Sequence, residues 1–246
     1  MGNKPFQNKL TAGATLSEIV AACSDADELL TAIGLKPAEY KDQSLRSVCQ
    51  QLKWSENEVL RWLKRHCSST NGQAKKEDSP KMIEDWGRYI KNEYHRKNRE
   101  YIKAIEKDFL RVHQIHGNQY VWLKNMQWQF ERLQEALQMY SRFEARKFYP
   151  LLSKMENAKG DLLYGSLKKV ERGMEVIQKD QDRIHGFMKK LKVGSNNFDN
   201  PANACSTLRI LNHNFKELFK NINEHFELEQ EKVLPMVQKK METVFK

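Results

Sequence analysis

Two ionisable residues interrupt an otherwise apolar seam near the end of the chain. The apolar residues of this seam recur at steps of three and four, the spacing of the buried face of a helix. They are Leu208, Leu211, Phe215, Leu218 and Ile222. The next two positions are His225 and Glu229. An imidazole and a carboxylate one turn apart on a buried face could bind a metal ion or join a buried polar network.

Three other segments carry polar side chains at comparable seam positions. These residues are His95, Tyr140, Glu144, Gln181 and, one turn further along, His185. Burying an unpaired carboxylate is costly, so such groups need partners. A hydrogen-bonded network without metal is one solution. For His95, Glu144, His225 and Glu229 together we favour a metal, because carboxylates from two helices plus imidazoles suit a non-haem di-iron or di-manganese centre.

Long segments with helical period must position these residues. They cover about 81–115, 119–153, 160–191 and 201–240. No period-2 strand pattern competes, so we predict an all-α fold with an antiparallel four-helix bundle over 81–243. In a hairpin that turns at Gly117, His95 lies 22 residues before the turn and Tyr140 lies 23 after it. The two should therefore meet at one level.

A polar, breaker-rich stretch at 67–80 reads as a linker between the bundle and a small helical domain at 14–66, which follows a tail at 1–13. Helix N-caps are predicted at Thr15, at Ser44 and at Ser55, where Glu58 would complete a capping box. The segment 44–66 could also form a helix-turn-helix. Its basic end would suit phosphate contacts and consists of Arg61, Lys64, Arg65 and His66. A small packing domain is the favoured interpretation.

Composition narrows the class of protein. The 246 residues carry a net charge of +10, from 42 Lys+Arg and 32 Asp+Glu. The charges are dispersed, which favours a solvated surface over a nucleic-acid partner. No apolar run could span a bilayer and no secretory signal is evident, so we expect no membrane partner. The four cysteines are far apart in sequence, and we expect reduced thiols in a cytoplasmic protein.

The region 81–240 resembles the hemerythrin-like domain of the di-iron "repair of iron centres" family. The motifs that carry the resemblance are YHRKNR at 94–99, VHQIHG at 112–117, FEARKFYP at 143–150, PANACSTLR at 201–209 and HFELEQEKVLP at 225–235. The region 14–66 is similar to the family's small leading domain. The family's Cys-Cys-Gly-Gly motif falls on Lys36-Pro37-Ala38-Glu39-Tyr40-Lys41, so both of its cysteines are missing.

The resemblance implies a set of metal ligands. It carries histidine ligands onto His95, His116 and His225, and bridging carboxylates onto Glu144 and Glu229. The family has two further histidine ligands, at the positions that Tyr140 and Gln181 occupy here. A Tyr140 phenolate and the His185 imidazole could replace these two ligands. One metal would then lie near His95 and Tyr140, and the other near His185 and His225. A continuous helix would place His116 about 31 Å from His95, so His116 can join only if that helix breaks.

The resemblance also implies a function. It points to a cytoplasmic iron protein that handles O2 or NO in nitrosative or oxidative stress, or that repairs iron–sulfur centres in client proteins. A di-iron centre is the favoured cofactor, and manganese or a single iron are alternatives. An alternative function is a metal-poor regulatory or partner-binding helical protein, with helix-turn-helix contacts to DNA. Iron storage or delivery is a third. No hydrolase motif such as HExxH or GxSxG occurs, and the sequence leaves open whether the protein is an enzyme.

Overall fold

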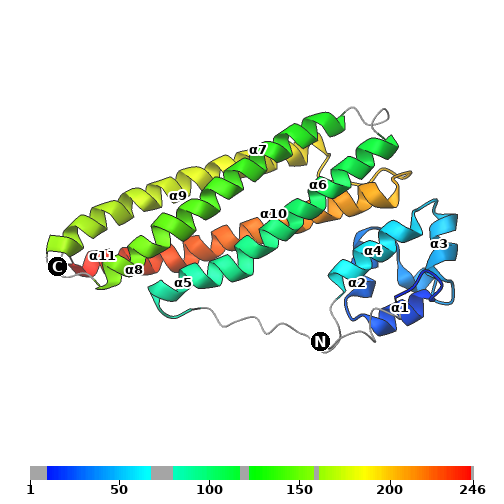
Figure 1. Ribbon diagram of the computed structural model, residues 1–246, viewed down its shortest axis with the longest axis horizontal. Coiled ribbons are helices and arrows are strands. Elements are labelled where there is room, and N and C mark those ends of the chain that lie inside the picture. Colours follow the sequence, from blue (N-terminus) through cyan, green and yellow to red (C-terminus); the bar gives the residue numbers. More distant parts are fainter. Residues whose placement is uncertain (1–9, 68–79, 117–121, 158–160, 245–246) are drawn as a thin grey trace. The chain divides into compact units, whose positions relative to one another are not determined.

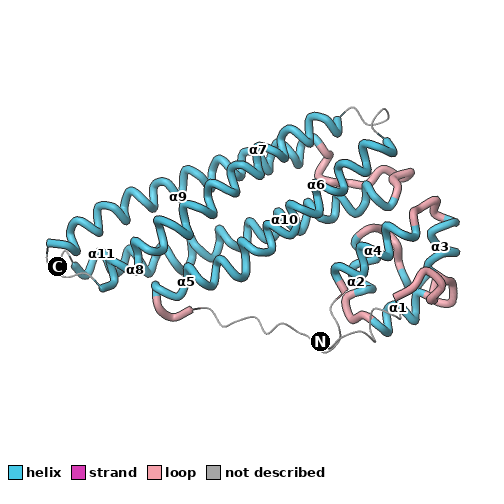
Figure 2. The backbone as a smooth tube through the Cα atoms, viewed as in Figure 1, coloured by secondary structure: helices cyan, strands magenta, loops and turns pink. Residues whose placement is uncertain are grey.

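The computed structural model describes residues 10–67, 80–116, 122–157 and 161–244. It divides the chain into two compact units. Unit 1 comprises 1–76, 107–116 and 199–214, and unit 2 comprises 77–106, 117–198 and 215–246. The described residues form helices and no strand (Figure 2). The predicted all-α fold, a helical bundle preceded by a small helical domain, is therefore confirmed.

Four helical runs build the bundle, and most of their length belongs to unit 2 (Figure 1). The first is α5 (Ile83–Ile90), η2 (Lys91–His95) and α6 (Arg96–His116). The second is α7 (Trp122–Phe143), η3 (Glu144–Phe148) and α8 (Tyr149–Asn157). The third is α9 (Asp161–Gly194), and the fourth is α10 (Ser206–Leu228), η4 (Glu229–Val233) and α11 (Leu234–Val244). Within unit 2, α7 packs along α9 and α5 packs along α8.

The predicted seam of the fourth run lies in the core. Each of its five apolar residues is fully buried, namely Leu208, Leu211, Phe215, Leu218 and Ile222. The two ionisable residues that continue the seam, His225 and Glu229, are buried as well. The predicted turn at Gly117 lies outside the described residues, as do 68–79 of the predicted linker and 1–9 of the predicted tail. Within the described ranges no helix is long and apolar enough to cross a bilayer.

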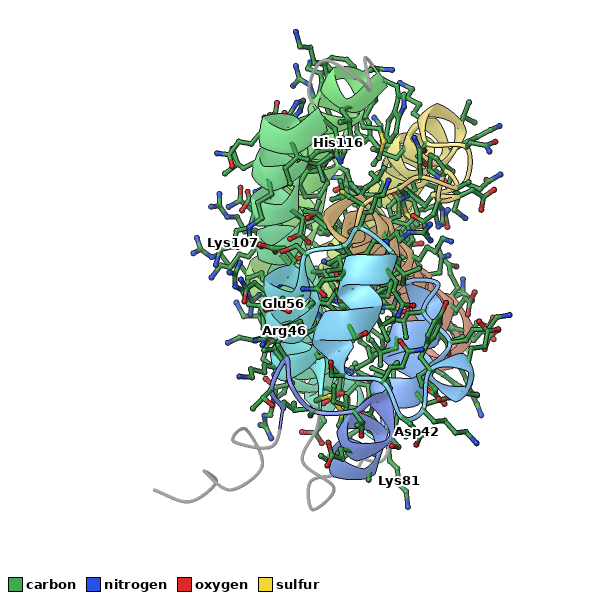
Figure 3. The ribbon with its side chains drawn as sticks, turned by 90° about the vertical axis from the view of Figure 1, so that its right-hand side faces the viewer. Asp42, Arg46, Glu56, Lys81, Lys107 and His116 are labelled. Carbon is green, nitrogen blue, oxygen red and sulfur yellow. A yellow bond between two sulfur atoms is a disulfide. The ribbon has the colours of Figure 1, made fainter. Side chains whose placement is uncertain are left out.

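The described part of unit 1 contains five short helical elements together with the end of α6 and the start of α10. The elements are α1 (Leu16–Ala22), α2 (Ala26–Ala32), η1 (Pro37–Glu39), α3 (Leu45–Gln51) and α4 (Glu56–His66). An Arg46–Glu56 ion pair of 3.1 Å joins α3 to α4; both side chains are labelled in Figure 3. The core of this unit also takes in Ile210 of α10, so unit 1 extends beyond the predicted domain at 14–66.

Two of the three predicted N-caps have the expected hydrogen bonds. Thr15 forms a capping box with Glu18, and Ser44 accepts from the backbone N–H of Ser47. The capping box predicted at Ser55 is wrong, because the Ser55 side chain makes no cap hydrogen bond. The Glu58 carboxylate forms ion pairs with two guanidinium groups instead, those of Arg61 at 3.0 Å and Arg111 at 2.8 Å.

Helix α4 carries the basic residues that suggested phosphate contacts, and of these Arg61, Lys64 and Arg65 are exposed. Its apolar side buries Val59, Trp62 and Leu63 in the core. The His66 ring lies 5.5 Å from the Trp62 ring, and burial, with a contribution from the Arg65 charge, lowers the pKa of His66 to about 4. His66 is thus neutral near pH 7 and offers no charge to a phosphate.

Two of the four cysteines form a disulfide, which corrects the expectation of reduced thiols. Cys23 follows α1 and Cys67 follows α4, and packing of both helices in one core brings their Cα atoms to 5.7 Å. Cys49 and Cys205 are free. Burial, with a smaller effect of Glu56, raises the pKa of the Cys49 thiol to about 12, so it behaves as a small apolar core residue.

Asp108 of α6 predicts a specific dependence of stability on pH. Its carboxylate is 1% exposed and accepts from the Asn214 amide at 2.7 Å. Burial raises the pKa of Asp108 from 3.8 to about 6, against the favourable effects of Arg65, Asn214 and Arg111. The folded state therefore holds the proton more tightly than the unfolded state, so the free energy of unfolding falls as pH rises from about 4 to about 6.

Asp108→Asn should remove that fall. The pKa difference corresponds to at most about 3 kcal/mol, and loss of the Arg111 ion pair offsets part of it. We expect the variant to gain about 1–2 kcal/mol over the wild type near pH 7.5, and little near pH 4. Denaturant unfolding at both pH values tests this, with Asp42→Asn on the surface as control. Equal effects of the two substitutions at both pH values would contradict the prediction.

Candidate metal centre

Three π-helical turns place candidate ligands in the bundle. His95 is the last residue of η2, whereas Glu144 and Glu229 are the first residues of η3 and η4. After each turn a backbone N–H donates to the carbonyl five residues earlier, for example from Tyr149 to Glu144. The extra residue shifts the buried face of the helix at that point, and π turns of this kind are frequent at functional sites.

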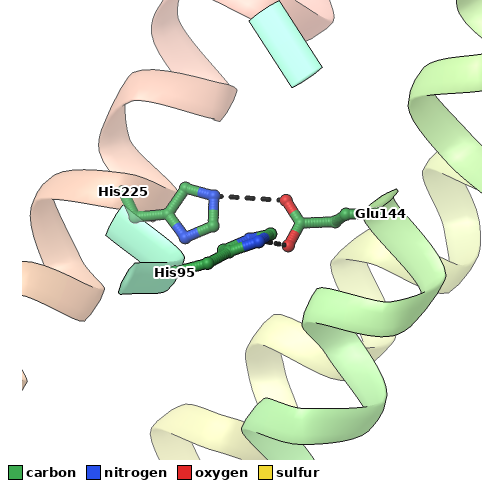
Figure 4. A group of neighbouring side chains, drawn as sticks. All are labelled: His95, Glu144 and His225. Carbon is green, nitrogen blue, oxygen red and sulfur yellow. Dashed lines mark hydrogen bonds and ion pairs between the residues drawn. The ribbon is translucent and has the colours of Figure 1, made fainter. Parts of the chain in front are cut away.

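Two imidazoles flank one buried carboxylate (Figure 4). His95 Nε2 lies 2.8 Å from Glu144 Oε2, and His225 Nε2 lies 3.2 Å from Glu144 Oε1. The three side chains are 3%, 0% and 1% exposed for His95, Glu144 and His225, and one donor atom from each falls within 4.8 Å of the others. Two histidines and a carboxylate are a donor set typical of non-haem iron. The residues therefore fit a metal ion.

Glu229 lies beside this group and is held by three hydrogen-bond donors. Its Oε1 accepts from the Tyr149 hydroxyl at 2.7 Å. Its Oε2 accepts from the Tyr140 hydroxyl and from the Gln181 amide, the latter at 3.0 Å. His225 Nε2 is 3.7 Å from the same Oε2. One network thus contains the predicted residues Tyr140, Gln181 and Glu229 and the two imidazoles, and His225 is the residue that links them.

Burial dominates the electrostatics of the cluster. It raises the pKa of Glu229 to about 8, with a further contribution from the nearby Glu144 charge. Burial likewise raises the pKa of Tyr140 and of Tyr149 well above 10, and it lowers the pKa of His225 to about 4. A neutral His225 imidazole is the form that binds a divalent cation, and a bound cation would favour the deprotonated form of the Glu229 carboxyl beside it.

Two predicted ligands lie away from the cluster. His185 on α9 has an exposed side chain, and its ring lies 5.2 Å from the Phe226 ring. His116 ends α6 in unit 1, and the helical run from Lys91 to His116 has no break. The structure therefore groups His95, Tyr140, Glu144, His225 and Glu229, with Gln181, and does not bring His185 or His116 to them.

Tyr149 is the residue of the network that sequence reasoning missed. In a regular α-helix, Phe148 follows Glu144 on the buried face and Tyr149 would turn away from it. The π turn at 144–148 rotates Tyr149 inward, so that it is 6% exposed and bonds Glu229. Pro150 is the feature of the sequence that could have indicated the π turn. It has no N–H to donate, so it interrupts the normal helical hydrogen bonds just after the turn.

A pocket of about 450 Å³ adjoins His95 between the α5–α6 run and α7–η3. Its basic lining residues are Lys91, Arg99, Lys103, Arg142 and Arg146. Ile102 and Leu137 are among its apolar lining residues, and the acidic side chain of Glu106 also lines it. The pocket gives a small molecule a place next to one of the two imidazoles.

Gly87 on α5 allows the close approach of Tyr149. A Cβ atom at Gly87 would lie 2.8 Å from Tyr149 Cβ, closer than such atoms come. Gly87→Ala should therefore push α5 from α8 and lower the free energy of unfolding by about 1–3 kcal/mol. Gly186→Ala is the matched control on α9, where nothing lies within 4 Å, and it should raise stability by up to about 1 kcal/mol. Denaturant unfolding of both variants tests the contrast; a gain from Gly87→Ala would contradict it.

Comparison with known proteins finds relatives that share one kind of name. No family model matches the chain. It is 22% identical over 155 residues to the iron–sulfur cluster repair protein ScdA of Staphylococcus haemolyticus, a match that covers 62% of this chain and 64% of that protein. It is 23% identical over 170 residues to the iron–sulfur cluster repair protein YtfE of Edwardsiella ictaluri, covering 66% and 72%. The YtfE protein of Cronobacter sakazakii is 22% identical over 142 residues, covering 58% and 60%.

The chain thus spans less than two thirds of the length of ScdA. All three relatives carry the same descriptive name, although they come from different bacteria. Together these similarities support the chain as a divergent member of the family of iron–sulfur cluster repair proteins.

Proposed function

We propose that the chain binds iron at His95, Glu144 and His225 and acts in the repair of iron–sulfur centres in other proteins. The observation that carries the proposal is the pair of buried imidazoles on the two oxygens of one buried carboxylate. The names of the relatives supply the biological role. Iron–sulfur proteins are the partners that this role requires.

The chain's own residues would hold and shield the ion. His95 and His225 would donate neutral nitrogen ligands, and Glu144 would supply charge and oxygen ligands. A bound iron would supply redox chemistry and affinity for O2 or NO. The pocket beside His95 would admit such a small molecule, while Tyr94, whose ring stacks on His225 at 5.1 Å, would fix the orientation of that imidazole.

We further propose a cytoplasmic location and a role in nitrosative or oxidative stress. The Cys23–Cys67 disulfide makes the location testable, because cytosolic proteins keep most thiols reduced. Alkylation of thiols in intact cells measures how much of the Cys23–Cys67 pair is bonded there, and a largely reduced pair would support the cytoplasm. A disulfide that is already complete in cells would argue for an oxidising compartment.

Metal content is the decisive test of the proposed function. Protein purified from iron-replete cells should carry iron, and iron-free protein should recover it on anaerobic incubation with Fe²⁺. Loaded protein should also restore the activity of an iron–sulfur enzyme whose cluster has been damaged by nitric oxide. Failure to bind iron after reconstitution would refute the proposal; binding without restored activity would refute only the repair role.

A further inference from the structure

The hydrogen bonds around Glu229 bear on the number of metal ions that the centre can hold. A carboxylate offers about four lone-pair sites. Three of those on Glu229 already accept bonds, from Tyr149, Tyr140 and Gln181, which come from three different helices. These donors are themselves 6%, 1% and 2% exposed, respectively. The carboxylate is therefore enclosed by fixed protein donors on most of its sides.

Gln181 is turned so that it cannot serve as a ligand here. Its amide nitrogen donates to the Tyr140 oxygen and to Glu229 Oε2, both at 3.0 Å. Its carbonyl oxygen, the atom that could bind a metal, instead accepts from the Gln230 amide at 2.7 Å. Reversing the amide would set that oxygen against the Glu229 carboxylate, so the network fixes its direction.

Charge leads to the same conclusion. The buried carboxylates of unit 2, within the residues that the structure describes, are Glu144 and Glu229. When both are deprotonated, their two negative charges balance one divalent ion. A second ion would bring two more positive charges into a site where the described side chains supply no further buried anion, and unbalanced buried charge is costly.

We infer that the centre takes one metal ion, on His95, Glu144 and His225, and that hydrogen-bonded Tyr140, Tyr149 and Gln181 fill the place around Glu229 where a second ion would bind. This inference rests on the proposed iron binding. A single ion at ~2.1 Å from each ligand atom can be reached by donors up to ~4.2 Å apart, and the Glu144 oxygens lie 2.8 Å from His95 Nε2 and 3.2 Å from His225 Nε2. Tyr140 is then a positioning residue for Glu229 and not a metal ligand.

Titration of the full-length protein with Mn²⁺ and with anaerobic Fe²⁺ tests the inference. Binding should saturate at about one ion per chain, and bound Mn²⁺ should give the electron paramagnetic resonance spectrum of an isolated ion. Saturation at about two ions with an exchange-coupled spectrum would overturn the inference but leave the proposed function standing. Absence of any binding would refute the proposed function itself.

Two variants test the roles of the individual side chains. Tyr140→Phe should leave the ratio at about one ion and leave the visible spectrum of the ferric protein unchanged. A phenolate-to-iron band that this substitution abolishes would overturn the inference. The double variant Tyr140→His/Gln181→His replaces two hydrogen-bond donors by imidazoles. If its helical content is unchanged, the double variant should bind about two ions per chain. A ratio that stays at one would contradict the inference that these two residues prevent binding of a second ion.

Discussion

Replacing Glu144 by glutamine should lower the affinity for Fe²⁺ by at least ~100-fold, since disturbing only the hydrogen-bond partners of metal ligands already costs about 10–100-fold. Glu144 is the group that His95 and His225 share, at 2.8 and 3.2 Å. Glutamine keeps the size of the side chain but removes its charge. It also turns an amide N–H toward one of the two imidazole nitrogens, whose lone pair would otherwise face the metal.

The matched control is Glu135→Gln, the same substitution on the exposed face of α7. Glu135 pairs with Arg132 at 3.2 Å, and both side chains are largely exposed. Its loss should change metal affinity by no more than about twofold. Competition with a chelator of known affinity measures both variants. If Glu144→Gln bound Fe²⁺ as tightly as Glu135→Gln, the His95–Glu144–His225 group would not be the metal site.

The parts of the site that could be predicted are those that follow from a regular helical period. The fourth run shows this well, because steps of three and four residues lead through five apolar residues directly to His225 and Glu229. The hairpin arithmetic that set His95 level with Tyr140 agrees with the structure, where both rings contact the His225 ring, at 5.4 and 5.8 Å. Periodicity therefore predicts that His95, Tyr140, His225 and Glu229 lie in the core.

The same reasoning failed where the helices depart from the α-helical period. A π turn adds one residue, so the residues after it change face. The regular α-helical period therefore does not predict that Tyr149 is buried. Pro150 and Pro235 each stand six residues after a carboxylate of the site, Glu144 and Glu229. Such a repeated Glu-to-Pro spacing signals an interrupted ladder. The turn at Lys91–His95 has no proline after it and offers no comparable signal.

The direction of a side chain is a further limit on prediction. The seam position of Tyr140 predicts a possible phenolate ligand, and Gln181 occupies a comparable seam position. Their seam positions are confirmed by burial, but the direction of each side chain is set by its hydrogen-bond partner, Glu229 for Tyr140 and Gln230 for Gln181, both on η4. Those partners follow from packing between helices, which the sequence period does not contain.

The disulfide is another feature that the helical period of the sequence does not predict. Cys23 and Cys67 are 44 residues apart, and only the packing of α1 with α4 in one core brings them together. Cross-linking a loop of this length restricts the unfolded chain, which by loop-closure entropy is worth about 4 kcal/mol. Reduction should therefore lower the free energy of unfolding of unit 1 by about that amount, while the metal centre in unit 2 is unaffected.

Hydrogen exchange on the full chain measures this effect where it arises. A loss of about 4 kcal/mol corresponds to roughly 10³-fold faster exchange of the most protected amides in α1 and α4 when the wild type is reduced. The double variant Cys23→Ser/Cys67→Ser should exchange fast with or without reductant. Cys205→Ser, at a free and half-buried cysteine, should keep the response of the wild type to reductant. If reduction left α1 and α4 equally protected, unit 1 would owe its stability to its buried core, in which Leu30, Val59 and Trp62 are fully buried, and not to the cross-link.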